Sequence, residues 1–157
     1  MADAKGLQVL FANTAEGIAL HEVIFDEFGK AVNYRIVDCN PQFEKILGIA
    51  KSDAVGKLAT EVYKQAQAPY LQEYAEVAKT KSHITLEIYF APMGKYFSIS
   101  VTAWKEHGFA TSFTDITAQK DTSLALAKHL ESINRLLKKH QVIRGNHFCR
   151  IISEIAA

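Results

Sequence analysis

Residues 34–43 have the sequence YRIVDCNPQF, in which a β-strand passes directly into a helix. Asparagine is a favoured helix N-cap, and Asn40 stands where the strand-forming residues end. Pro41 suits the first helical position, because its missing N–H costs no hydrogen bond there. Apolar residues then recur at helical spacing as far as Gly48. We therefore expect a strand that ends at Cys39 and a short helix that begins at Pro41.

Upstream of this segment, the sequence predicts one helix and one more strand. Apolar residues at helical spacing in residues 4–14 indicate an amphipathic helix, so we assign residues 1–15 to an N-terminal flanking helix. Residues 18–25 are rich in strand-forming residues, and the polar residues 26–30 separate them from the strand at 32–39. The two strands are expected to form a hairpin.

Downstream, several short helices precede three more strands. The helices are expected at residues 52–55, 59–65 and 69–79. Apolar and polar residues alternate, as they do in half-buried strands, over residues 84–90, 96–104 and 109–116. This segregation indicates an α+β domain over residues 16–117, in which short helices cover one face of a five-stranded antiparallel sheet.

The last quarter of the chain is predicted to be a separate helical element. Its apolar residues recur at steps of four and three, as in the seam of a two-stranded coiled coil: Leu126, Leu130, Ile133 and Leu137. We predict an exit helix over residues 118–142 that forms the seam of a homodimer, and the alternative is a helix folded back on its own sheet. The pattern weakens over residues 143–157, which we interpret as a linker or the start of a following domain.

Four segments of the chain resemble the PAS sensory domains of bacterial signal-transduction proteins. They are residues 34–43, 55–57 (VGK), 92–98 (PMGKYFS) and 113–117 (FTDIT). The resemblance extends over residues 8–120, and the asparagine–proline helix start and the Asp-Ile-Thr triplet are its most specific parts. It implies a PAS fold and a sensor whose exit helix relays a signal to an effector domain absent here, such as a kinase, cyclase or phosphodiesterase of a two-component or related system.

The resemblance also implies a small cavity between the short helices and the last three strands. An apolar pocket with a few polar groups is typical of sites that bind small molecules. The candidate lining residues are Phe43, Leu47, Tyr63, Leu71, Tyr74, Ile88, Phe97, Ile99 and Phe113. The alternative is that these bulky side chains fill the core at close-packed density and leave no space for a ligand.

Two cofactors of PAS relatives are disfavoured by the residues at single positions. Haem-binding relatives carry a histidine on the longer helix, but residues 69–79 contain none, and the nearest is His83 at the start of a strand. Light sensors with a covalent flavin carry a reactive cysteine in the preceding helix, but residues 59–65 contain none. Cys39 is expected to be a small buried hydrophobic residue. The cofactor is therefore unknown, and non-covalent flavin stays open.

No residue pattern supports a catalytic or a metal site. The sequence has no glycine-rich phosphate loop and no nucleophile elbow. His21 and Glu22 are adjacent on a strand, without the second histidine of a zinc-protease helix. His129, His140 and His147 lie in the tail, and we expect the histidines to be solvated or at interfaces. We predict no catalytic residue and no metal ligand, so a small α+β enzyme is the least favoured function.

Asp115 and Thr117 stand at the junction between the last strand and the exit helix. Thr117 is suited to cap the helix, and Asp115 is suited to accept hydrogen bonds beside it. In PAS domains the Asp-Ile-Thr triplet joins the sheet to the exit helix. The resemblance therefore implies that these two residues couple the sheet to the helix.

Composition and charge limit the partners and the location. The 157 residues include 18 basic and 17 acidic residues, so the chain lacks the overall charge of a nucleic-acid-binding protein. The 7 basic and 3 acidic residues of segment 119–157 are too small an excess to predict binding to a membrane or to nucleic acid. Two isolated cysteines and no apolar run of bilayer length predict a cytoplasmic protein. The predicted function is a sensory module for a small molecule or a partner, with a ligand-free PAS dimerisation scaffold as the alternative.

Overall fold

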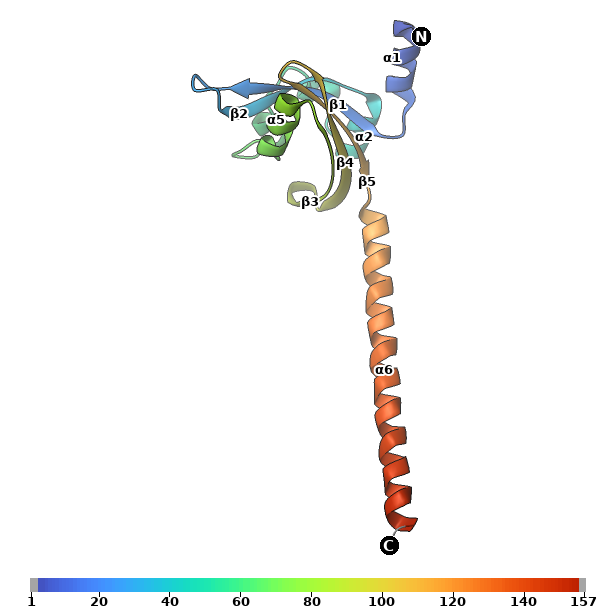
Figure 1. Cartoon of the computed structure of the whole chain (residues 1–157). Helices are drawn as coiled ribbons and strands as arrows, with labels where there is room; N and C mark the ends of the chain where they lie inside the picture. Colours follow the sequence, from blue (N-terminus) through green and yellow to red (C-terminus); the bar gives the residue numbers. More distant parts are fainter. Residues whose placement is uncertain (1–2, 156–157) are drawn as a thin grey trace. The chain divides into compact units, whose positions relative to one another are not determined.

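The structure is a computed structural model that describes residues 3–155, and for residues 143–149, 151, 152, 154 and 155 it describes the backbone alone. The chain divides into two units, a domain that ends at Ile116 and a helix that begins at Thr117 (Figure 1). The domain contains α1 (Ala4–Asn13), β1 (Gly17–Phe25), β2 (Ala31–Cys39), α2 (Pro41–Leu47), α3 (Lys51–Ala54), α4 (Ala59–Tyr63), α5 (Leu71–Thr80), β3 (His83–Phe90), the 3-10 turn η1 (Ala91–Met93), β4 (Lys95–Lys105) and β5 (Gly108–Asp115). The second unit is α6 (Thr117–Ile155).

The five strands form one antiparallel sheet in the order β2-β1-β5-β4-β3. β1 and β5 are neighbours at its centre, where Gly17 pairs with Phe113 and Glu22 pairs with Gly108. Helices α2, α3, α4 and α5 contact the strands from one side, and the core lies between them and the sheet (Figure 1). The predicted α+β architecture and the predicted hairpin of the first two strands are confirmed.

The start of α2 has the predicted local structure. Asn40 is its N-cap, Pro41 is its first residue, and Gly48 ends it in the left-handed conformation with φ 68°. A left-handed residue at this position suits glycine, which has no side chain to clash with the preceding turn. The strand-to-helix change in residues 34–43 is therefore fixed by the cap, the proline and the terminal glycine together.

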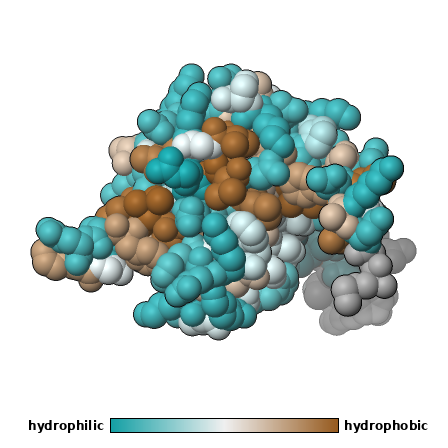
Figure 2. Space-filling model, turned by 90° about the horizontal axis from the view of Figure 1, so that it is seen from above, coloured by the Kyte–Doolittle hydropathy of each residue, from teal (hydrophilic) through white to brown (hydrophobic). Residues whose placement is uncertain are grey.

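The two faces of β1 are both partly apolar. Ala19, His21 and Val23 are buried against the helices, whereas Leu20 and Ile24 on the opposite face are half-buried. In the space-filling view from above, hydrophobic residues gather in the middle of the face and hydrophilic residues surround them (Figure 2). The composition of this strand therefore does not reveal which of its faces meets the core.

α5 begins slightly later than its sequence pattern suggests. Tyr70 precedes the helix in the left-handed conformation, with φ 53°, and Leu71 is the first helical residue. A bulky residue rarely adopts this conformation. Tyr70 therefore precedes the helix, and α5 begins two residues later than predicted.

α6 is one continuous helix that passes the residues where its apolar stripe weakens. Thr117, the residue predicted to cap this helix, is its first residue. The predicted boundary at residues 142 and 143 is not a helix end, since no proline interrupts the helix there. The side chains of His147 and Cys149 lie outside the described residues.

The apolar side chains of the α6 stripe are exposed to solvent in the single chain. Leu126, Leu130, Ile133 and Leu137 are 58, 53, 41 and 57 % exposed. Among the helices of residues 3–155, none combines the length and the apolar composition that crossing a membrane requires.

Candidate functional site

A cavity of about 60 Å³ lies between the sheet and the short helices that cover it. Seven of the nine predicted lining residues are on its wall: Leu47, Tyr63, Tyr74, Ile88, Phe97, Ile99 and Phe113. Ligand pockets usually have volumes of roughly 300–1,000 Å³. The bulky side chains therefore fill most of the core, and they leave a space that suits only a small molecule.

Two of the predicted lining residues lie elsewhere. Phe43 is completely buried, and its ring meets that of Phe113 edge-on, with 6.0 Å between the centroids. It therefore packs behind a residue of the wall without reaching the cavity. Leu71 lines a separate groove of about 460 Å³, next to the start of β2.

The remaining lining residues were not predicted, and most come from the first two strands and the loop before α5. They are His21, Tyr34, Pro69, Tyr70, Phe90 and Thr111. The expected cavity lay between the short helices and the last three strands, without the first two strands. β1 and β2 contribute to the wall because β1 pairs with β5 in the middle of the sheet.

His21 corrects the prediction that the histidines are solvated or at interfaces. It is 2 % exposed, and its ring stacks on Phe109 with 4.5 Å between the centroids and 8° between the planes. Burial lowers its pKa to about 3, although a hydrogen bond to the backbone of Phe109 acts in the opposite direction. The imidazole is therefore neutral in the folded domain near neutral pH.

The tyrosines of the cavity are also uncharged. Burial raises the pKa of the hydroxyls of Tyr34, Tyr63 and Tyr74, so all three stay protonated. The Tyr34 hydroxyl donates a hydrogen bond to the backbone oxygen of Pro69 at 3.1 Å. No Asp, Glu, Lys or Arg side chain is on the wall formed by the described residues. The cavity is thus an uncharged site with a few polar atoms.

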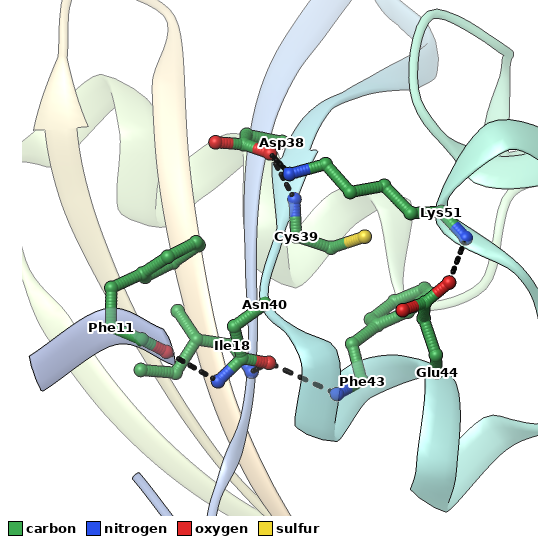
Figure 3. Close-up of polar contacts among 8 residues, drawn as sticks. All are labelled: Phe11, Ile18, Asp38, Cys39, Asn40, Phe43, Glu44 and Lys51. Carbon is green, nitrogen blue, oxygen red and sulfur yellow. Dashed lines mark hydrogen bonds and ion pairs between the residues drawn. The ribbon is translucent and has the colours of Figure 1, made fainter. Parts of the chain in front are cut away.

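A second buried polar group, the Asn40 side chain, holds the start of the domain together (Figure 3). Its oxygen accepts hydrogen bonds from the backbone N–H groups of Ile18 and Phe43, both at 2.9 Å. Its nitrogen donates to the backbone oxygens of Phe11 at 3.0 Å and Glu16 at 2.9 Å. We call Asn40 and these four backbone partners the Asn40 junction. It joins the end of α1, the start of β1 and the first turn of α2.

The residues next to Asn40 add contacts at the surface (Figure 3). Lys51 forms an ion pair with Asp38 at 2.5 Å, and its backbone N–H donates to the Glu44 carboxylate at 2.6 Å. Cys39 is completely buried, and burial raises the pKa of its thiol to about 11. The prediction of a small buried hydrophobic residue is confirmed, since a thiol held neutral and enclosed is not a reactive nucleophile.

The end of β5 is held by its neighbour β4. The Asp115 carboxylate lies 3.0 Å from the Lys95 ammonium, and the Ile116 N–H donates to the Tyr96 carbonyl at 2.9 Å. Asp115 is two residues beyond Phe113, which lines the cavity. A residue of the cavity wall and the residue that forms the ion pair therefore lie two positions apart at the end of β5.

The described residues contain no group of three or more His, Cys, Asp or Glu side chains that is arranged to hold a metal ion. α5 carries no histidine, and His83 is exposed at the start of β3, on the face of that strand opposite to Ile84 and Leu86.

Comparisons with known proteins agree on the fold. A protein-family model described as the PAS fold matches residues 31–121, more than half of the chain. A search of curated protein sequences yields no match.

Three solved structures are similar to the chain. A domain of an HTR-like protein from Haloarcula marismortui has 18% sequence identity and a TM-score of 0.50, with 66% of this chain and 100% of that chain covered. A domain of a sensory box sensor histidine kinase/response regulator from Geobacter sulfurreducens has 10% identity and a TM-score of 0.52, covering 71% and 93%. An RNA-binding light-oxygen-voltage receptor has 12% identity and a TM-score of 0.55, covering 80% and 36%. At these identities the likeness concerns the fold alone.

Proposed function

Because this chain belongs to the PAS family, we propose that it is a sensory module whose cavity detects a small molecule and whose C-terminal helix relays the result to an effector domain. The observation that carries this proposal is the cavity of about 60 Å³, which is lined mainly by aromatic and aliphatic side chains. A core packed only for stability leaves few spaces larger than a water molecule. The cavity is larger than that.

The relay is proposed to follow β5. Thr111 and Phe113 face the cavity, and Asp115 ends the strand in an ion pair with Lys95. α6 begins at Thr117, two residues further along the chain. A ligand shifts this strand only if it binds two arrangements of the wall with different affinity. Asp115 is then the residue through which a change in the sheet reaches the helix.

Replacing Asp115 tests the relay. With the chain joined to an effector such as a histidine kinase, Asp115→Ala should reduce the response of the effector to ligand while the domain stays folded. Glu27→Ala is the matched control, because Glu27 is an exposed acid in the β1–β2 turn. Equal responses of Asp115→Ala and the wild type would contradict the proposed path.

The output unit is proposed to be a parallel homodimer joined along the stripe of α6. Four apolar side chains at coiled-coil spacing are exposed in the single chain, and burial between two helices would remove them from water. Leu130→Lys should convert the dimer into a monomer in sedimentation velocity. Ser132→Lys, off the stripe, should leave the dimer intact. A monomeric wild type would instead favour the helix folded back on its own sheet.

The alternative function is a dimerisation scaffold without ligand. Native mass spectrometry of the chain purified from its own host separates the two functions. A bound small molecule supports sensing, and repeated isolation of an empty dimer supports the scaffold. An absorbance spectrum of the same sample reports a non-covalent flavin.

A further inference from the structure

Tyr70 lies where the cavity and the groove of about 460 Å³ beside β2 meet. Among the described residues it is the only one that lines both spaces. Aromatic and aliphatic side chains form most of the cavity wall. The groove wall also carries charged and amide side chains, which are Lys30, Gln67, Gln72 and Glu73. Tyr70 is therefore the boundary between a mainly apolar space and a more polar one.

Two contacts place the side chain of Tyr70 at this boundary. Its ring packs at a tilt against the ring of Tyr74, a residue of the cavity wall, with 6.0 Å between the centroids. Burial raises the pKa of the Tyr70 hydroxyl, and the negative charge of Glu73, a residue of the groove wall, adds to this rise. The half-buried side chain thus contacts the cavity wall and lies within electrostatic range of the groove wall.

The backbone holds Tyr70 in a conformation that is unfavourable for its residue type. Its φ of 53° lies in the left-handed region, which a bulky residue rarely adopts. The next residue begins α5, and the carbonyl of the preceding residue, Pro69, accepts the hydrogen bond from Tyr34. Strain of this kind collects at ligand sites, where the surrounding structure fixes the conformation. The packing around Tyr70 therefore holds its ring in place in spite of the backbone strain.

We infer that Tyr70 sets the length of the ligand, because its ring closes the cavity towards the groove and confines an apolar chain to the cavity. This inference rests on the proposed sensing function and assigns Tyr70 a role in specificity. Removing the ring should join the two spaces, so that a longer chain reaches the groove.

Straight-chain alcohols from ethanol to octanol measure the length of the site, since each differs from the next by one methylene. In NMR titrations of the whole chain, the affinity should rise about 4-fold for each methylene that is buried. In the wild type the rise should stop when the alcohol fills the cavity. In Tyr70→Gly it should continue for about two further methylenes, or about 16-fold. Glycine adopts the left-handed conformation readily, so this variant removes the ring without adding backbone strain.

Two control variants locate the limit. Tyr70→Phe keeps the ring, so it should keep the length limit of the wild type. Leu71→Ala widens the groove but leaves Tyr70 in place, and it should also keep the limit. The same limit in Tyr70→Gly as in the wild type, or a longer limit in Leu71→Ala, would overturn the role of Tyr70 and leave the cavity as a ligand site.

The wild type alone provides a test that does not depend on the folding of any variant. Bound alcohols should shift the methyl signals of Ile88 and Ile99, which line the cavity, and leave those of Val32 and Leu71, which line the groove. Shifts of both sets would overturn the closure by Tyr70. If no alcohol bound to the wild type or to Tyr70→Gly, the inference would be overturned, whereas the sensing function would be overturned by an empty cavity in protein from the host.

Discussion

The side chains of Asn40 and His21 are both buried in the domain, but they differ in the hydrogen bonds that they make. In the Asn40 junction, the amide oxygen and nitrogen make four hydrogen bonds to the backbone of three separate elements. In the ring of His21, by contrast, Nδ1 has no hydrogen-bond partner among the described residues. The two side chains are comparably buried, at 0 and 2 % exposure.

The difference separates a buried polar group that stabilises the domain from one that costs it stability. A buried polar side chain with every bond made stabilises the fold and cannot bind anything else without breaking it. A buried polar atom without a partner destabilises the fold, by about 1–3 kcal/mol. The following predictions test this contrast, and they begin with the largest expected effect.

Asn40→Ala should lower the free energy of unfolding by about 3 kcal/mol, because it removes a helix cap and leaves partly buried backbone groups of Ile18 and Glu16 unpaired. Urea denaturation of the two proteins measures the loss. Asn13→Ala is the control, since the Asn13 amide makes one exposed hydrogen bond within α1. If both variants lost a similar free energy of unfolding, the Asn40 junction would stabilise the domain no more than one exposed hydrogen bond does.

Acid should weaken the domain through His21. Its pKa is about 3 in the folded domain, against an ordinary value of 6.5 in the unfolded chain, so below pH 6.5 the unfolded chain takes up a proton that the folded domain does not. Stability therefore falls as the pH drops from 6.5 towards 3, by about 2 kcal/mol at about pH 5. Urea denaturation at pH 6.5 and at about pH 5 measures the change.

His21→Phe provides the reference for the acid effect. The variant lacks the titrating ring, so it should lose about 2 kcal/mol less than the wild type between the same pH values. The exposed histidines contribute equally to both proteins and cancel. Parallel pH curves for the two proteins would refute a neutral, buried His21.

Gly17→Ala should cost about 1–2 kcal/mol and should affect both regions at once. A Cβ at this position would lie 2.5 Å from the Phe113 ring, which lines the cavity, while the next residue, Ile18, bonds to Asn40. The ring has to move into the cavity. Urea denaturation measures the cost, and the shift of the Phe113 ring signals in NMR spectra reports the movement. Unchanged stability and unchanged ring signals would mean that the two regions are independent.

Lys51→Met should have the smallest effect, below about 1 kcal/mol, because the ion pair with Asp38 is about half exposed and water already solvates both charges. The bond from the Lys51 backbone to Glu44 does not depend on the side chain. Thermal unfolding, with Asn40→Ala alongside, measures the difference. If Lys51→Met lost as much stability as Asn40→Ala, the surface ion pair would stabilise this part of the fold as much as the buried asparagine does.

The junction was predictable from the sequence because its signals are local. A cap, a proline and a terminal glycine all stand within nine residues, and each acts on its own turn of backbone. The backbone groups of α1 and β1 that bond to Asn40 were not predictable, since they come from residues 22 or more positions away.

The cavity was predictable only in part, for a physical reason. Alternation along β3 and β4 shows which side chains face inward, and it found Ile88, Phe97 and Ile99. β1 is partly apolar on both faces, so nothing local places His21 inside. Leu71 was misplaced because it lines the groove beside the start of β2, although it lies only three residues before Tyr74 in α5. Apolar spacing along a short helix does not show which of its apolar residues reaches a particular cavity.

The central position of β5 has a consequence for the order in which the domain assembles during synthesis. β1–β2 and β3–β4 are hairpins of neighbouring segments, and each can form as soon as it leaves the ribosome. The strand that joins the two hairpins is the last to be made. Until Asp115 has emerged, the growing chain exposes two unpaired strand edges, at β1 and at β4. A nascent chain stalled just before β5 should therefore be the form most open to misassembly and to capture by chaperones.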